Sequence, residues 1–118
     1  MDLISELGAL GVNTQEAIER MNNNSAFYIR MLGKFTGELA NHEVMPYLES
    51  GDWQTAVTNA HTLKGLTGNL SVTPLYKAYT EIVALLRGNE PEKAKQLMAD
   101  TLPIQSEIVA CIEKYNNS

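Results

Sequence analysis

The chain has 118 residues and a mass of 13.0 kDa, which predicts one domain that spans residues 1–118. Hydrophobic residues make up 44% and charged residues 19% of the chain, proportions typical of a folded protein rather than a disordered one. Nine Lys and Arg against fourteen Asp and Glu leave a net charge of −5, which argues against a nucleic-acid or anionic-membrane binder, since both need a basic face.

Glycine, proline and helix-capping residues divide the chain into segments whose apolar residues recur with helical rather than strand period. The first predicted helix is short and ends at Gly8 or Gly11. A second helix follows a cap at Asn13 or Thr14, and Glu16 is placed to complete a capping box if Asn13 is that cap. No segment has the alternation that predicts a sheet.

A long amphipathic helix is predicted to begin at an N-cap on Ser25 and to continue through Leu48. Gly33 and Gly37 lie four residues apart on one face of it, which favours a close contact with another helix. Pro46 should bend or break this helix because proline removes one hydrogen bond of the helical ladder.

Three further helices are predicted, over residues 53–70, 73–87 and 91–112. Asp52 is the expected N-cap of the first, and Thr73 caps the second with Pro74 at its first helical position. Pro103 should kink the last. Short connections between long amphipathic helices favour antiparallel neighbours. The sequence therefore predicts an all-α fold, an up-down antiparallel four-helix bundle with an additional short N-terminal helix.

The helix over residues 53–70 has two distinct faces on a helical wheel. The predicted core face holds Trp53, Ala56, Ala60, Leu63, Thr67 and Leu70. The outward face holds Gln54, Thr58, His61, Lys64, Gly65 and Gly68. Each glycine inside a helix costs roughly 1 kcal/mol relative to alanine, so two of them beside a histidine need a reason. Either they permit close packing of another helix, or they leave the backbone beside His61 open to a large partner.

The second interpretation has a specific chemistry. A neutral imidazole is a nucleophile, and it can accept a phosphoryl group. Lys64 lies one turn beyond His61 and can compensate the negative charge of that group. Nucleophile, cation and open backbone share one stripe of the helix, which favours phosphoryl transfer.

The segment Ala60-His61-Thr62-Leu63-Lys64-Gly65-Leu66-Thr67-Gly68 closely resembles the His-x-x-Lys-Gly pattern of histidine-containing phosphotransfer (HPt) domains, including the small residue three positions further on. Gly51-Asp52, Leu75 and Leu10-Gly11-Val12 are also similar to this family. One position departs from it, since Ser71 stands where many members have a further glycine.

The resemblance implies a carrier rather than an enzyme, with no nucleotide site, no autokinase activity, no metal and no cofactor of its own. His61 would be the phosphoacceptor, at Nε2, and Lys64 would stabilise the phosphoryl charge. The partners would be response-regulator receiver domains, a hybrid sensor histidine kinase, or both, and Mg²⁺ would belong to the receiver. Receiver docking would use the residues around the histidine: Val57, Thr58, Gly65, Gly68 and Asn69.

Two alternatives to a stand-alone relay protein remain. The chain could be a helical-bundle scaffold that binds receiver or kinase domains without carrying phosphate, or the output module of a larger hybrid kinase. In each case a monomer is expected, because a bundle with one exposed polar face needs no partner for stability. Keeping His61, Lys64 and both glycines together favours the relay, because a scaffold does not need that combination.

The remaining candidate residues have ordinary interpretations. His42 is expected to be a solvated histidine, Cys111 a buried inert thiol, and Trp53 a packing anchor of the core. A lone cysteine excludes an internal disulfide and a cysteine-cluster zinc site. No apolar run is long enough to span a bilayer, and the acidic start of the chain is unlike a signal peptide, so a cytoplasmic protein is expected.

Overall fold

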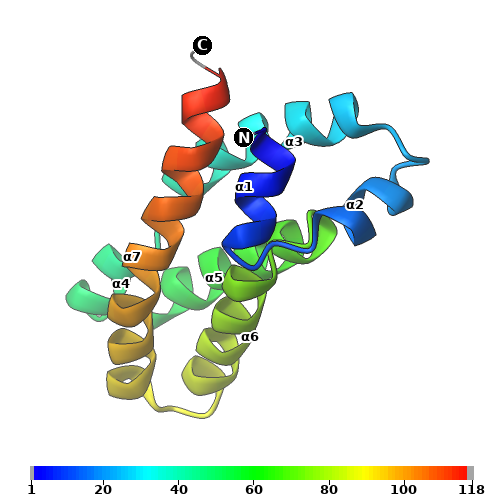
Figure 1. The fold of residues 1–118 in the computed structure, drawn as a ribbon. Helices are drawn as coiled ribbons and strands as arrows, with labels where there is room; N and C mark the ends of the chain where they lie inside the picture. Colours follow the sequence, from blue (N-terminus) through cyan, green and yellow to red (C-terminus); the bar gives the residue numbers. More distant parts are fainter. Residues whose placement is uncertain (1, 117–118) are drawn as a thin grey trace.

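The computed structural model describes residues 2–116, and all regular secondary structure in this range is helical (Figure 1). The helices are α1 Leu3–Ala9, α2 Thr14–Arg20, α3 Ser25–Asn41, α4 Met45–Ser50, α5 Trp53–Asn69, α6 Thr73–Arg87 and α7 Pro91–Asn116. The all-α prediction is confirmed for these residues.

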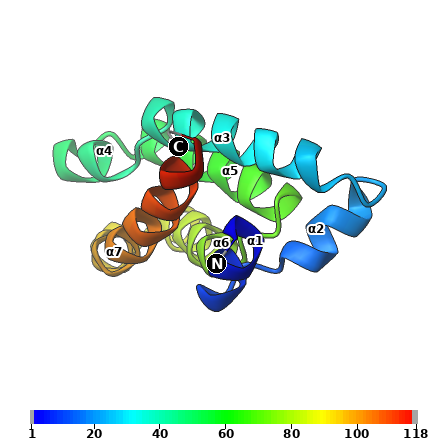
Figure 2. The ribbon, with the colours of Figure 1, turned by 45° about the horizontal axis from the view of Figure 1, so that its top comes forward.

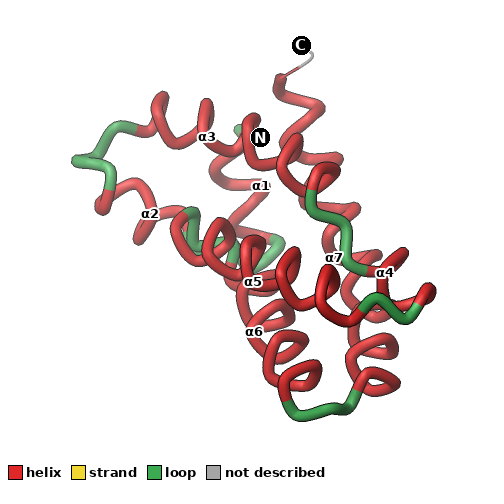
Figure 3. The backbone as a smooth tube through the Cα atoms, turned by 180° about the vertical axis from the view of Figure 1, so that it is seen from behind, coloured by secondary structure: helices red, strands yellow, loops and turns green. Residues whose placement is uncertain are grey.

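The helices pack along an elongated body of 40 × 26 × 22 Å. α5 lies against α6 and α6 against α7, while α3 and α4 both contact α7 and α1 covers α7 from another side (Figure 2). In the view turned by 180°, α5 is the helix nearest the viewer (Figure 3). The connection between α2 and α3 projects from the end of the molecule opposite α4. α5 therefore has one face on the core and one face that no other long helix covers.

Side chains from every helix meet in one core. Its largest fully buried members are Tyr28, Tyr79, Phe35, Leu7, Leu32, Leu63, Leu75, Ile82, Met98, Ile108, Ile112 and Val72. Gly33 faces the end of α7, because a Cβ there would lie 2.8 Å from Nδ2 of Asn116, the tip of a flexible side chain. Gly37 has no such neighbour within 4 Å, so the expected close contact exists at only one of the two glycines.

Local capping signals place several helix starts correctly. Asn13 caps α2 by accepting a hydrogen bond from the Glu16 backbone nitrogen at 3.3 Å, and Asp52 caps α5 through the Thr55 nitrogen at 3.1 Å. Two starts were predicted one residue late, because Asn24 rather than Ser25 caps α3 and α6 begins at Thr73 itself. The N-cap of α6 is Val72, whose side chain makes no capping hydrogen bond.

The two internal prolines have different effects. The predicted helix over residues 25–48 is interrupted, since α3 ends at Asn41 and α4 starts at Met45 with Pro46 in its first turn. The proline ring would clash with the carbonyl of His42 in a continuous helix, and the chain breaks at that residue. α7 instead continues through Pro103, which lies on its exposed side where solvent can bond the freed carbonyl.

Trp53 corrects one prediction. The tryptophan was expected to anchor the core, but 41% of its surface is exposed. It is the first residue of α5, and its ring lies beside the α4–α5 turn, where a Cβ on Gly51 would be 4.0 Å from Cζ2 of the indole. Within residues 2–116, no helix combines the length and the apolar character needed to cross a membrane.

Candidate functional site

α5 presents the predicted site because its two faces differ in burial. Asp52 holds the start of the helix with two bonds to Thr55, one from the backbone nitrogen and one from the hydroxyl at 2.8 Å. Ala56, Ala60, Leu63 and Thr67 are buried, as the periodicity predicts. His61 lies on the opposite face and is exposed. The exposed position expected for this histidine is confirmed.

A shallow pocket of about 500 Å³ forms around the histidine, here called the His61 pocket. It is lined by Glu16, His61, Lys64, Gly65, Gly68, Asn69 and Tyr76. Among residues 2–116 the imidazole of His61 has no hydrogen-bond or ion-pair partner, and neither does the ammonium of Lys64. An exposed imidazole without a partner is free to react, and the cation of Lys64 lines the same pocket.

The two glycines of this stripe have different surroundings. A Cβ on Gly65 would have nothing within 4 Å, so its backbone is open to solvent. A Cβ on Gly68 would lie 3.0 Å from Cε1 of Tyr76, a contact so tight that the ring would have to shift by a few tenths of an ångström. Of the two interpretations of these glycines, close packing against α6 accounts for Gly68, whereas only Gly65 fits the open-backbone interpretation.

Arg20 connects α2 to the C-terminal end of α5 by hydrogen bonds. Its guanidinium donates to the carbonyl oxygens of Gly68 at 3.2 Å and Asn69 at 2.6 Å. It also donates to Glu16 at 2.7 Å and to the hydroxyl of Ser71 at 3.0 Å, and that hydroxyl donates to the same Glu16 oxygen at 2.7 Å. The carboxylate of Glu16 is thereby charge-compensated where it borders the His61 pocket.

Ser71 itself has a left-handed backbone with a φ of 52°. That conformation favours glycine, which is the residue many HPt domains have at the corresponding place. Here the serine is held by its bonds to Arg20 and Glu16, and its carbonyl accepts from the Asn13 nitrogen at 2.9 Å. The turn keeps a glycine-like conformation without the glycine, so this departure from the pattern leaves the end of α5 in place.

A second contact fixes the same helix end from α3. The hydroxyl of Tyr28 donates to the Leu70 carbonyl at 2.9 Å inside the protein. Burial raises the pKa of Tyr28 to about 12, so this phenol stays protonated and remains a donor near neutral pH. Two helices distant in sequence thus hold the C-terminal end of α5, one turn beyond Lys64.

The predicted docking residues are not all brought together. Gly65, Gly68 and Asn69 line the His61 pocket, but Val57 and Thr58 do not. Val57 is half-buried against the core, and the hydroxyl of Thr58 donates back to the Gln54 carbonyl at 2.9 Å on the exposed side.

An apolar groove beside the His61 pocket was missed by sequence reasoning. It has a volume of about 460 Å³, shares Asn69 with the pocket, and is here called the α2–α3–α5 groove. Its apolar lining comes from Met21, Phe27, Met31, Phe35, Leu66 and Leu70, with Arg20, Lys34 and Glu38 among them. Periodicity placed these side chains on separate helices, but no local pattern shows which helices are adjacent.

Tyr76 and Arg20 were also missed, for a similar reason. Tyr76 is 39% exposed and lies eight residues beyond Gly68, across the α5–α6 turn. Arg20 is separated from its two carbonyl partners by 48 and 49 residues. Gly68 was the one feature of the sequence that could have indicated the nearby ring of Tyr76, because small residues inside helices commonly mark a close neighbour.

His42 and Cys111 differ from their expected surroundings. His42 is half-buried, and its Nδ1 lies 3.0 Å from the Glu38 carbonyl oxygen, because the ring folds back on the end of α3. Cys111 is half-buried rather than buried, and its thiol donates to Glu6 at 3.6 Å. Burial and then the Glu6 carboxylate raise the pKa of this thiol, in agreement with the expected low reactivity.

Comparison of the chain with protein-family models, with curated protein sequences and with solved structures finds no significant match in any of the three. In the described range, no three His, Cys, Asp or Glu side chains are grouped so that they could hold a metal ion.

Proposed function

We propose that this chain is a phosphorelay intermediate of the HPt type, built on a four-helix bundle in which α3 and α4 together form one member and α5, α6 and α7 form the other three. The observation that carries the proposal is the exposed imidazole of His61, which has no partner among residues 2–116 and lies beside the open backbone of Gly65. A phosphoryl group on a histidine has to enter and leave with a large protein partner, and this arrangement leaves room for one.

The proposed step is a reversible transfer between two side chains. The lone pair of His61 Nε2 attacks the phosphorus of a receiver's aspartyl phosphate, the N–P bond forms, and the P–O bond breaks with its electrons returning to the aspartate. Little covalent chemistry is required of the carrier, since phosphoryl transfer depends mainly on position and charge. Lys64 supplies a positive charge in the same pocket, and Mg²⁺ would be held by the receiver.

The α2–α3–α5 groove supports the docking part of the proposal. Transient interfaces have an apolar centre with a polar rim, and here apolar side chains lie next to the polar His61 pocket. Phe27, Met31 and Leu66 are half-buried and available for contact, and Met31 can adapt its shape to a partner. Asn69 lines both the groove and the His61 pocket, so a receiver seated on this groove would border the pocket that holds His61.

Transfer of label from a phosphorylated receiver domain tests the proposal. Receivers carrying ³²P-aspartyl phosphate are mixed with the wild-type chain, with His61→Gln and with His42→Gln; these are the only two histidines in the sequence. We expect acid-labile, alkali-stable label on the wild type and on His42→Gln but not on His61→Gln. A receiver that binds the wild type without labelling it better than His61→Gln would favour the scaffold alternative and refute the relay.

A further inference from the structure

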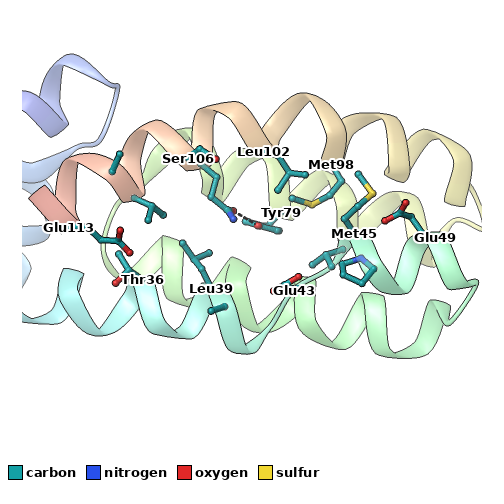
Figure 4. Close-up of a pocket in the computed structure, with 16 residues that line it drawn as sticks. Thr36, Leu39, Glu43, Met45, Glu49, Tyr79, Met98, Leu102, Ser106 and Glu113 are labelled. Carbon is teal, nitrogen blue, oxygen red and sulfur yellow. Dashed lines mark hydrogen bonds between the residues drawn. The ribbon is translucent and has the colours of Figure 1, made fainter.

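A second groove lies on a different part of the molecule, between α3 and α4 on one side and α7 on the other (Figure 4). It has a volume of about 620 Å³, and its floor includes the buried side chains of Leu39, Val44, Tyr79 and Met98. This α3–α4–α7 groove shares no residue with the His61 pocket. A partner bound here would leave His61 accessible.

Part of the lining of the α3–α4–α7 groove is apolar and adaptable. Met45 and Met98 line it, and Leu102 on its rim is 36% exposed. Methionine side chains adjust to the shape of an apolar ligand, and an exposed leucine gains free energy when a partner covers it. The groove can therefore bury an apolar surface.

Its rim carries charge of one sign. Glu113 lies at one end of the groove, Glu49 at the opposite end and Glu43 between them (Figure 4). Within residues 2–116 none of these three carboxylates has an ion-pair or hydrogen-bond partner, and no Lys, Arg or His lines the groove. Four other glutamates do have basic partners: Glu6, Glu16, Glu38 and Glu90.

The length of the groove suits a helix. Its lining on α7 runs from Met98 to Glu113, which corresponds to roughly 22 Å at a rise of about 1.5 Å per residue. That distance is about four turns of a partner helix. A second copy of this chain is a poor occupant, because each copy has a net charge of −5 and would meet three unpaired carboxylates.

We propose that the α3–α4–α7 groove binds a basic amphipathic helix of another protein, with apolar side chains on its floor and Lys or Arg paired with Glu43, Glu49 and Glu113. Helices laid in grooves bind through apolar anchors at helical spacing, and complementary rim charges select the partner. The proposal does not depend on His61 carrying phosphate.

Binding of a synthetic peptide to the full chain tests the groove. The probe has about 15 residues, with leucines at i, i+3, i+4 and i+7 spacing and lysines elsewhere, and its counterpart has glutamate in place of lysine. Fluorescence anisotropy should show binding of the lysine peptide that weakens as salt rises, and at least tenfold weaker binding of the glutamate peptide. Equal binding of the two peptides would overturn the proposal.

Matched substitutions decide whether the groove is the site. Glu43→Gln, Glu49→Gln and Glu113→Gln combined should weaken lysine-peptide binding about tenfold, since each exposed pair contributes about two- to threefold. The control combines Glu19→Gln, Glu81→Gln and Glu92→Gln, which changes the net charge equally away from the groove. Equal loss in both triple variants would refute the site.

A second pair of variants tests the apolar rim of the groove. Leu102→Ser should weaken peptide binding about three- to tenfold, whereas Ile104→Ser, on the same helix, 45% exposed and outside the groove, should leave it unchanged. Circular dichroism checks that both variants remain helical. Sedimentation that showed a dimer lost with Leu102→Ser but kept with Ile104→Ser would assign the groove to a second copy and overturn the proposal.

Discussion

Replacement of Gly65 by larger residues should raise stability and lower phosphotransfer at the same time. This glycine lies inside α5 and is exposed, and a Cβ added there meets nothing within 4 Å. A helix-interior glycine costs about 1 kcal/mol relative to alanine. Gly65→Ala should therefore increase the free energy of unfolding by about 1 kcal/mol, which corresponds to a rise of about 3–5 °C in the melting temperature.

The functional effect has the opposite sign because the added atoms enter the His61 pocket. Gly65→Leu should keep the added stability, since leucine also favours helix, but its side chain would project from the surface that the proposed receiver approaches. We expect receiver-to-His61 transfer to slow by more than tenfold for Gly65→Leu, the equivalent of at least 1.4 kcal/mol, and by less for Gly65→Ala.

Two other glycines provide controls for this experiment. Gly37 is also inside a helix, exposed and without a neighbour within 4 Å, and it lines neither the His61 pocket nor the α2–α3–α5 groove. Gly37→Leu should stabilise the protein without changing transfer. Gly68→Ala should gain no stability, because the ring of Tyr76 has to move. Thermal melts and single-turnover transfer measure both effects. Wild-type transfer by a stabilised Gly65→Leu would refute the role of open backbone.

Three further substitutions test individual contacts. Lys64→Ala should slow transfer about tenfold without abolishing it, while Lys77→Ala on the exposed side of α6 should not; a wild-type rate for Lys64→Ala would remove the lysine from the mechanism. Arg20→Met removes the donors to the last carbonyls of α5 and should lower unfolding free energy by about 1–3 kcal/mol in urea titrations; an unchanged midpoint would contradict this. The pKa of Cys111 is raised by burial and by Glu6, so less of it is thiolate at pH 8 and alkylation by iodoacetamide should be slower than that of a free thiol. Glu6→Gln should speed that alkylation, and no change would show that the carboxylate has no influence on the thiol.

The sequence by itself determined the features that depend on neighbouring residues. Asp52 and Asn13 marked helix starts because a cap bonds backbone groups only two or three residues away. The 3.6-residue period distinguished buried Ala60 and Leu63 from exposed His61, because the face on which a helical residue lies depends only on its spacing from its neighbours. Trp53 was predicted to be buried but is exposed. The helical period shows which side of α5 the tryptophan is on, but it does not show whether another segment packs against that side at the first residue of the helix.

Only the tertiary structure decided which helices meet. Arg20 reaches the carbonyls of Gly68 and Asn69 across nearly half of the chain, and Tyr76 fills the space that Gly68 leaves. The grooves beside α5 and α7 arise in the same way, from side chains of helices that pack at angles no local pattern specifies. Local spacing shows which face of a helix is apolar, whereas contacts between distant segments depend on how all the helices fill one core.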